Sequence, residues 1–237
     1  MVLPVYNEVR SLKRAVEETV YFLVRIGLDF EVIIAEDGST DGTAELAESI
    51  SALDPRVKCF SHGDRLGRGR ALTEAFRRSE GSVLVYMDVD LATELRFLEP
   101  LIEAVFEGYD MVTGSRALPQ SRVSRSMKRG VTSLVYNSFV RLLLGSDIHD
   151  HQCGFKAFRR ETLLKVLDKV RAKHWFWDTE ILVLATRMGL SVNEVPISWR
   201  EGEKTKVNLF RDFIDMGFQT LKLWWRLRIR SGYHQSS

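Results

Sequence analysis

Residues 82–90 read SVLVYMDVD, an apolar run that ends in two acids one residue apart, Asp88 and Asp90. The run has the composition of a strand buried on both faces. Comparable runs are MVLPVY at residues 1–6, FEVIIAE at 30–36, VKCFSH at 57–62 and MVTGSR at 111–116. Segments with the apolar spacing of helices lie between the earlier runs, at about residues 8–26, 41–53 and 71–78. Strands that alternate with amphipathic helices predict a doubly wound α/β fold around a mostly parallel sheet.

The composition is that of a globular protein with a substantial core. Of the 237 residues 45% are apolar, and 34 Lys and Arg against 32 acids give a net charge of +2, which does not indicate a nucleic-acid binder. Cys59 and Cys153 fit no disulfide framework, which favours a reducing, cytoplasmic setting. The chain starts without a signal-peptide pattern, and no window reaches the ~18 uninterrupted apolar residues of a spanning helix. We therefore expect no integral membrane segment.

Polar clusters stand at the ends of four predicted strands. They are Pro4 to Glu8, Glu36 and Asp37, Asp88 and Asp90, and Gly114 to Arg116. The carboxyl ends of parallel strands meet at one edge of the sheet, where doubly wound folds bind ligands. We therefore expect these clusters to surround a single crevice.

Asp88 and Asp90 are two residues apart on a strand, so both carboxylates lie on the same face. Such hard oxygen ligands suit Mg²⁺ or Mn²⁺ better than zinc. Magnesium usually completes its shell with water and substrate phosphates, so the pair predicts a phosphorylated ligand.

Several motifs together resemble family 2 glycosyltransferases of the GT-A fold, over nearly the whole chain. They are PVYNE at residues 4–8, the acidic strand end with GSTDGT at 38–43, DVD at 88–90, GSR at 114–116, DHQCGFKAF at 150–158 and WFWDTE at 175–180. The chain is most similar to the polyprenyl-phosphate branch, the dolichyl-phosphate mannose and glucose synthases. The resemblance implies a Rossmann-like sandwich and a metal-dependent, inverting transfer of a hexose from a UDP- or GDP-sugar to a polyprenyl or dolichyl phosphate.

The resemblance also implies roles for individual residues. Asp88 and Asp90 would hold the donor diphosphate through Mg²⁺ or Mn²⁺. The nucleotide base and ribose would contact Pro4, Tyr6, Glu8 and Asp37, while the acceptor phosphate would contact Arg116, Arg129 and Ser133. A loop that closes over the diphosphate would contribute Arg200 and Lys206, and a glycine-rich turn would bring Arg68 and Arg70 near the donor phosphates.

The residues after the DVD motif bear on the choice of donor. Mannose-type relatives usually have a glutamine there that serves as a further metal ligand, whereas this chain continues with Leu91, Ala92 and Thr93. The missing ligand favours UDP-glucose over GDP-mannose.

Asp178 and Glu180 leave the need for a general base open, since either acid can act as a base or merely orient sugar hydroxyls and cationic side chains. A lipid phosphate is largely dianionic at neutral pH and needs no strong base. The alternatives to this function are a family 2 enzyme with a saccharide, lipid or protein hydroxyl as acceptor, a nucleotidyltransferase, and a non-catalytic nucleotide-sugar-binding membrane protein. A zinc site at His149, His151 and Cys153 is disfavoured because no fourth ligand is evident.

The C-terminal segment combines large apolar residues with Lys and Arg in an amphipathic pattern. We divide the chain into a catalytic domain, residues 1–206, and a C-terminal helix, residues 207–237. The helix is predicted to lie on the cytoplasmic face of a membrane as a peripheral anchor, and packing on the catalytic domain is the alternative.

Overall fold

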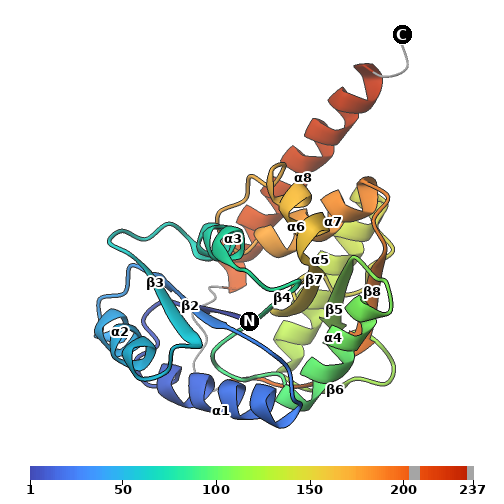
Figure 1. The fold of residues 1–237 in the computed structure, drawn as a ribbon. Helices are drawn as coiled ribbons and strands as arrows, with labels where there is room; N and C mark the ends of the chain where they lie inside the picture. Colours follow the sequence, from blue (N-terminus) through green and yellow to red (C-terminus); the bar gives the residue numbers. More distant parts are fainter. Residues whose placement is uncertain (203–208, 234–237) are drawn as a thin grey trace.

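The computed structural model describes residues 1–202 and 209–233, which form a seven-stranded sheet between layers of helices (Figure 1). The strand order is β3-β2-β1-β4-β7-β5-β8. The bounds are β1 Val2–Val5, β2 Val32–Asp37, β3 Val57–His62, β4 Val83–Met87, β5 Met111–Ser115, β7 Phe155–Arg159 and β8 Val192–Pro196. All neighbouring strands in this sheet are parallel except at β7, which runs antiparallel to β4 and β5. The predicted α/β fold with a mostly parallel sheet is confirmed.

The strands are buried on both faces because their side chains alternate between two apolar cores. Ile33 and Tyr86 point into one core, and their neighbours Ile34 and Val85 point into the other. Helices α3 (Arg68–Arg78), α6 (Arg160–Leu167) and α7 (Trp177–Arg187) cover the first face, and α1 (Leu12–Arg25), α2 (Thr43–Leu53) and α4 (Leu98–Phe106) cover the second. Continuous apolar strands are therefore explained by helices on each side.

The chain direction of the sheet fixes where a ligand can bind. Strand β1 pairs with β2 on one side and with β4 on the other, so the order of connections reverses between β1 and β4. Doubly wound folds have their crevice at such a switch point, outside the carboxyl ends of the strands. The segments that follow β1 and β4 contain Glu8 and Asp88, and they therefore meet there.

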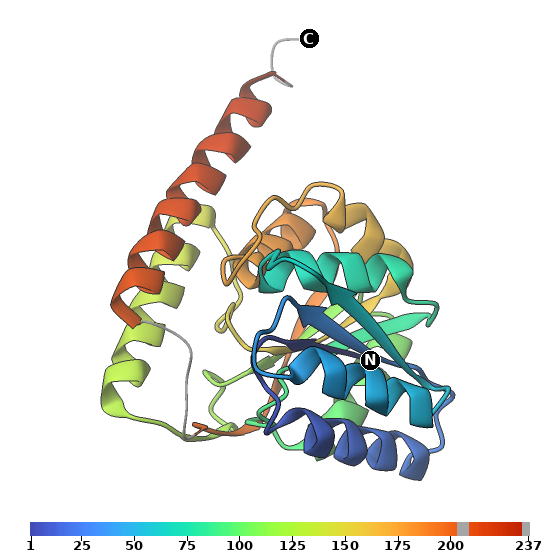
Figure 2. The ribbon, with the colours of Figure 1, turned by 90° about the vertical axis from the view of Figure 1, so that its left-hand side faces the viewer.

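A second group of elements lies at this edge of the sheet. The short strands β6 (Arg122–Ser124) and β9 (Ser198–Arg200) pair in parallel, and η1 (Leu95–Phe97) precedes α4. Helix α5 (Met127–Leu144) lies beside α8 (Leu209–Tyr233), and the far end of α8 projects beyond the body of the protein (Figure 2). Within the described residues, no helix has the length and apolar character needed to cross a bilayer. The division of the chain at residue 206 stays a prediction, because that boundary lies outside the described residues.

Candidate active site

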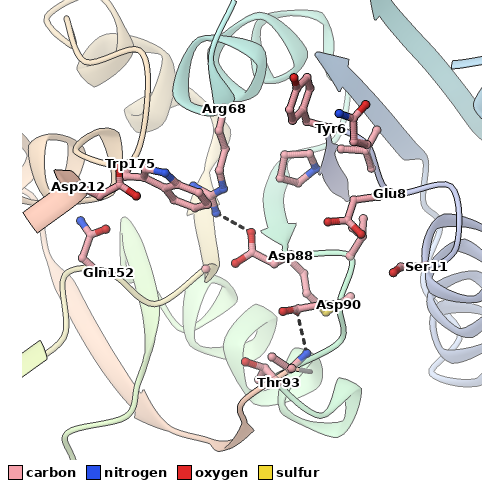
Figure 3. A pocket seen from close by; sticks show the side chains of 18 of the residues that line it. Tyr6, Glu8, Ser11, Arg68, Asp88, Asp90, Thr93, Gln152, Trp175 and Asp212 are labelled. Carbon is pink, nitrogen blue, oxygen red and sulfur yellow. Dashed lines mark hydrogen bonds and ion pairs between the residues drawn. The ribbon is translucent and has the colours of Figure 1, made fainter. Parts of the chain in front are cut away.

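A cavity of about 900 Å³ opens at the carboxyl ends of β1, β2, β4 and β5. Its lining includes most of the predicted site residues, namely Pro4, Tyr6, Glu8, Asp37, Asp88, Asp90, Arg116, Arg129 and Ser133. In Figure 3, Tyr6 and Glu8 lie on one side of Asp88 and Asp90, and Gln152, Trp175 and Asp212 lie on the other. The crevice expected from four separate strand ends is thus one chamber.

Arg70 and three other predicted site residues do not line this cavity within the described part of the chain. Arg200 ends β9 with an exposed side chain, and Lys206 lies outside the described residues. Asp178 and Glu180 are buried in the first turn of α7, each 2% exposed. These two acids therefore sit in the protein interior.

The carboxylate of Asp88 is held from two directions directly after β4. Arg68 Nη2 lies 2.7 Å from Asp88 Oδ1. On the other side, a Cβ built on Gly154 would lie 1.9 Å from Asp88 Oδ2, so only glycine leaves room for this carboxylate. Gly154 comes just before β7, and its carbonyl oxygen accepts the Asp88 backbone N–H at 3.2 Å. The antiparallel strand is what brings the DHQCGF motif under the acid pair.

Asp90 also faces the cavity and accepts the backbone N–H of Ala92 at 3.0 Å. Burial and, secondarily, the charge of Asp88 raise the pKa of Asp90 above its ordinary value. A carboxylate whose ionisation a neighbouring acid disfavours suits a divalent cation, which relieves the repulsion. The described residues contain no cluster of three or more His, Cys, Asp or Glu placed as metal ligands. The pair therefore fits a Mg²⁺ or Mn²⁺ ion whose remaining positions go to water or phosphate.

Asp37, at the end of β2, shapes the part of the cavity that Tyr6 also lines. Asp37 Oδ1 accepts the backbone N–H of Leu66 at 2.7 Å and of Gly67 at 3.1 Å, which fixes the turn before α3. Gly67 has a φ of 101°, and a Cβ there would also meet His174 at 2.5 Å. The Arg65 guanidinium lies 3.8 Å from the centre of the Tyr6 ring, an arrangement that stabilises a planar cation on an aromatic face.

Arg116, directly after β5, forms hydrogen bonds and an ion pair with a buried acid. Asp150 accepts from Arg116 Nε at 2.7 Å, from Nη2 at 2.9 Å and from the Arg116 backbone N–H at 3.0 Å. Burial alone would raise the pKa of Asp150, but the Arg116 guanidinium holds it well below its usual range. The Trp199 ring stacks on the same guanidinium at 5.4 Å. Arg116 is therefore held in a fixed position in the cavity wall.

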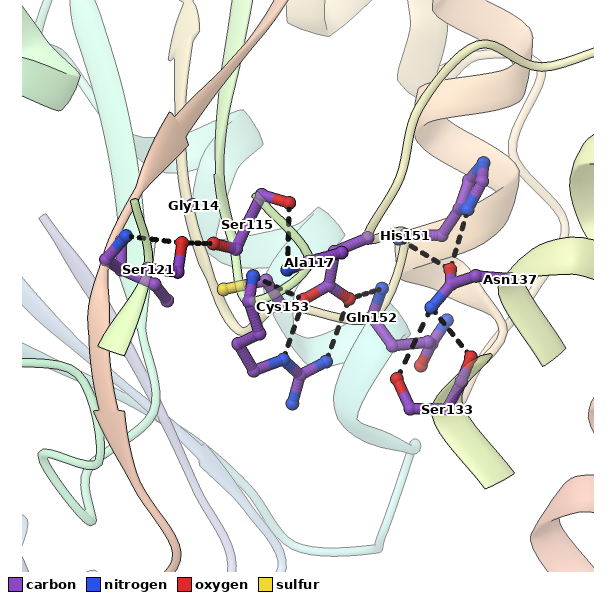
Figure 4. A network of polar contacts seen from close by, with 12 residues as sticks. Gly114, Ser115, Ala117, Ser121, Ser133, Asn137, His151, Gln152 and Cys153 are labelled. Atoms are coloured by element: carbon purple, nitrogen blue, oxygen red, sulfur yellow. Dashed lines mark hydrogen bonds and ion pairs between the residues drawn. The ribbon is translucent and has the colours of Figure 1, made fainter. Parts of the chain in front are cut away.

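Arg129 and Ser133 lie in the first half of α5, on its cavity side. Arg129 Nη1 contacts Glu201 Oε1 at 3.0 Å. Ser133 accepts from Asn137 Nδ2, whose carbonyl oxygen contacts His151 Nδ1 at 2.9 Å (Figure 4). This network ties α5 to the loop that carries Asp150, the partner of Arg116. It also occupies His151 with hydrogen bonds, which disagrees with a role as a zinc ligand.

The two acids of WFWDTE have separate partners in the interior. Asp178 Oδ2 lies 2.7 Å from Arg68 Nη1, and Oδ1 accepts from Tyr86 Oη and from Lys156 Nζ. Glu180 accepts the backbone N–H groups of Arg171 and Ala172 and forms an ion pair with Arg226 of α8. Burial raises the pKa of Asp178 to about 6, against the opposing effect of Arg68. Neither acid faces the cavity space in which an acceptor would bind.

Sequence reasoning missed several residues that line the cavity or hold the side chains in its wall. Asp150 and Gly154 lie inside a recognised motif, but their roles as partners of Arg116 and Asp88 depend on the antiparallel strand β7. Asp212, Phe213 and Met216 also line the cavity, and they come from α8, for which the sequence indicated packing on the catalytic domain only as the alternative.

The chain matches the family Glycosyl transferase family 2 over residues 1–167, and it belongs to that family. It is 50% identical over 233 residues to the glycosyltransferase AglD of Haloferax volcanii, which covers 97% of this chain and 37% of AglD. It is 30% identical to the dolichyl-phosphate beta-glucosyltransferase of Saccharomyces cerevisiae, covering 91% of this chain and 71% of that protein. The chain thus spans little more than a third of the length of AglD.

A solved structure gives the fold independently. Glucosyl-3-phosphoglycerate synthase from Mycobacterium tuberculosis, in complex with Mn²⁺, UDP and phosphoglyceric acid, superposes with a TM-score of 0.68 at 22% identity, covering 93% of this chain and 74% of that chain. The resemblance to GT-A glycosyltransferases that the motifs suggested is confirmed for both family and fold.

Proposed function

We propose that the protein transfers a hexose from a nucleotide sugar to a polyprenyl or dolichyl phosphate, with inversion at the sugar and with Mg²⁺ or Mn²⁺ at Asp88 and Asp90. UDP-glucose is the favoured donor, because Ala92 stands near the acid pair and supplies no further metal ligand, and because the yeast relative is named for glucosyl transfer. GDP-mannose is the second candidate.

The observation that carries the proposal is the opposition of charges inside one cavity. Asp88 and Asp90 follow β4 at one side, while Arg116 follows β5, Arg125 precedes α5 and Arg129 lies in its first turn. A metal-bound diphosphate needs the acids, and a second phosphate needs the arginines. Two phosphorylated substrates can therefore be held in one chamber without direct repulsion.

The chemistry follows from where charge develops. Breaking the bond between the sugar and the diphosphate leaves negative charge on the leaving group, and a bound divalent cation would stabilise that charge. Arg116, fixed by Asp150, and Arg129 would orient the acceptor phosphate so that its oxygen attacks the anomeric carbon. A dianionic phosphate needs no proton removed, which agrees with the interior position of Asp178 and Glu180.

On the donor side, Pro4, Tyr6, Glu8 and Asp37 are proposed to contact the base and ribose. All four line the part of the cavity at the ends of β1 and β2. The planar Arg65 on the Tyr6 ring lies in the same part and extends this surface. We keep Arg200 and Lys206 as proposed contacts of a loop over the diphosphate.

We propose that the protein attaches peripherally to the cytoplasmic face of a membrane through α8 and α5. Large apolar side chains are exposed along both helices, among them Leu134 and Leu142 on α5 and Phe218 and Trp225 on α8, at 67%, 88%, 57% and 63%. Lys222 and Arg228 are also exposed on α8 and would attract anionic lipid. The inner sides of the same helices line the cavity, so a lipid phosphate would reach it from the membrane. The two cysteines are free thiols, as in a reducing compartment.

One observation favours a second candidate, transfer to a hydroxyl acceptor. Such a reaction needs a general base, and Asp212 of α8 is an acid that lines the cavity near Trp175 and Gln152 (Figure 3). In the phosphate reaction Asp212→Asn should retain most of the activity. In a hydroxyl reaction the same change should lower kcat by about 100-fold or more.

The deciding experiment measures transfer of labelled sugar into an organic-extractable lipid. The full chain is supplied with UDP-glucose or GDP-mannose, with Mg²⁺ or Mn²⁺ and with dolichyl phosphate, beside an Asp90→Ala control. Metal-dependent label in the lipid that is absent from the control supports the proposal and selects the donor. A folded protein that binds nucleotide but transfers sugar from neither donor contradicts it, and directs attention to hydroxyl acceptors or a non-catalytic role. With a nucleoside triphosphate and a sugar phosphate supplied in place of the nucleotide sugar, release of diphosphate would indicate a nucleotidyltransferase.

A further inference from the structure

Four charged side chains form an unbroken chain from the cavity into the interior. Asp88 pairs with Arg68 at 2.7 Å, Arg68 with Asp178 at 2.7 Å, and Asp178 with Lys156 at 2.9 Å. Their side chains become steadily more buried along this path, at 42%, 14%, 3% and 0% exposure. Acids and bases alternate and their charges sum to zero. The negative charge of Asp88 is therefore already compensated by a cation of the protein.

Arg68 is fixed in this position by its surroundings. It is the first residue of α3, and its guanidinium lies 5.2 Å from the ring centres of both Tyr86 and Trp175. Two acids hold its two terminal nitrogens. A side chain restrained by two ion pairs and two aromatic rings has little freedom to move away when another cation arrives.

A metal ion at Asp88 and Asp90 would consequently bind beside a fixed positive charge. Asp90 and Glu8 contribute negative charge near this point, and Arg116 contributes positive charge that acts on Asp88. Like charges a few ångströms apart repel strongly in a partly buried site. A diphosphate is negatively charged and can contact both the metal ion and Arg68. It would therefore offset the repulsion between these two cations.

We propose that Arg68 makes metal binding depend on the donor, by weakening the affinity of Asp88 and Asp90 for a free divalent cation and then binding the donor diphosphate beside that cation. Asp178 is the positioning residue that holds Arg68 in place from below. This role rests on the proposed function, because it assumes a donor with a diphosphate.

The test measures Mn²⁺ binding to the full chain by electron paramagnetic resonance, with and without UDP. Arg68→Gln should bind Mn²⁺ alone roughly tenfold more tightly than the unaltered protein, since the repelling charge is gone. The same variant should bind UDP in the presence of Mn²⁺ roughly tenfold more weakly. Arg77→Gln is the matched control, because Arg77 lies on the same helix, its exposed side chain pairs with Asp168 away from the cavity, and the change should alter neither value.

Two further variants keep the test decisive if Arg68→Gln does not fold, as judged by circular dichroism. Arg68→Lys keeps the charge and should leave the Mn²⁺ affinity within about threefold of the unaltered protein. Asp178→Asn removes a compensating acid and should weaken binding of Mn²⁺ alone by several-fold.

The inference is overturned if folded Arg68→Gln binds Mn²⁺ alone no more tightly than the unaltered protein, or, where that variant is lost, if Asp178→Asn leaves Mn²⁺ affinity unchanged. Failure of the proposed function has a different signature. Normal Mn²⁺ and UDP binding with the Arg68 effect intact, but without sugar transfer to lipid phosphate, supports the role of Arg68 and contradicts the acceptor. An unaltered protein that binds neither Mn²⁺ nor UDP contradicts both.

Discussion

Gly154→Ala should abolish activity while leaving the fold nearly intact. A Cβ at this position would lie 1.9 Å from Asp88 Oδ2 and 2.6 Å from Asp88 Cγ, whereas non-bonded carbon and oxygen atoms need more than 3 Å. The carboxylate must therefore move by more than about 1 Å. It is the end of a side chain and can rotate toward the cavity, so the free energy of unfolding should fall by only about 1–2 kcal/mol. A displacement of this size at a reacting centre costs about 100-fold or more in rate.

The assay combines sugar transfer, Mn²⁺ titration and thermal unfolding. Gly154→Ala should transfer sugar at least about 100-fold more slowly and need more Mn²⁺ for half-maximal rate, with the unfolding midpoint lowered by only a few degrees. Gly63→Ala is the matched control, because a Cβ at Gly63 meets nothing within 4 Å. Transfer and Mn²⁺ affinity within about twofold of the unaltered protein would refute the reasoning that Asp88 acts from this exact position.

Three other changes test separate parts of the structure. Asp150→Asn should weaken the ion pair that positions Arg116 and should raise the KM for the acceptor phosphate more than that for the donor. It should also lower the free energy of unfolding by about 3 kcal/mol, because a buried guanidinium loses its counter-charge. An unchanged KM for the acceptor would contradict this. Burial lowers the pKa of His151 to about 3, so the folded state excludes a proton that the unfolded chain accepts below its ordinary pKa of 6.5. The contribution of His151 to the free energy of unfolding should accordingly fall by about 1.4 kcal/mol per pH unit between about pH 6 and 4, while Asp178, whose pKa burial raises to about 6, contributes in the opposite sense. In urea unfolding, the stability of His151→Gln should therefore fall less steeply with falling pH than that of the unaltered protein; equal slopes would show that His151 is not the titrating group. Trp225→Glu should reduce sedimentation with phosphatidylserine vesicles by about tenfold without changing the unfolding midpoint, whereas Leu53→Glu, at an 86% exposed residue of α2, should not affect it; similar behaviour of the two variants would argue against a membrane face on α8.

The sequence predicted the parts of the site that depend on strand order. Because strands β1, β2 and β4 are parallel and buried on both faces, their carboxyl ends meet at one edge, and Glu8, Asp37 and Asp88 converge there without further information. The same reasoning predicted that Asp90 faces the cavity together with Asp88, as it does. The local sequence pattern and the alternation of side chains along a strand were sufficient to predict where these residues lie.

Other features depend on contacts between distant segments and leave no local pattern. Strand β7 is inserted antiparallel between β4 and β5, and nothing in FKAFR distinguishes that direction from the parallel one. Its direction determines that Gly154 meets Asp88. Similarly, the pairing of Arg68 with Asp178 spans 110 residues, and the spacing of WFWDTE alone could not separate a catalytic acid from a buried one.

The first turn of α7 explains why both acids of WFWDTE are buried. Residues two apart on a helix point in roughly opposite directions, so Asp178 and Glu180 cannot serve the same surface. Asp178 faces the sheet and holds Arg68 and Lys156 beneath the acid pair. Glu180 faces the 171–172 loop and Arg226 of α8. The first turn of α7 contacts both Arg68, beside Asp88, and α8, the helix proposed to lie on the membrane. A rigid α7 therefore keeps the position of α8 relative to the cavity constant. Charge compensation and positioning therefore explain an acid in either position, and proton transfer by Asp178 or Glu180 stays a prediction.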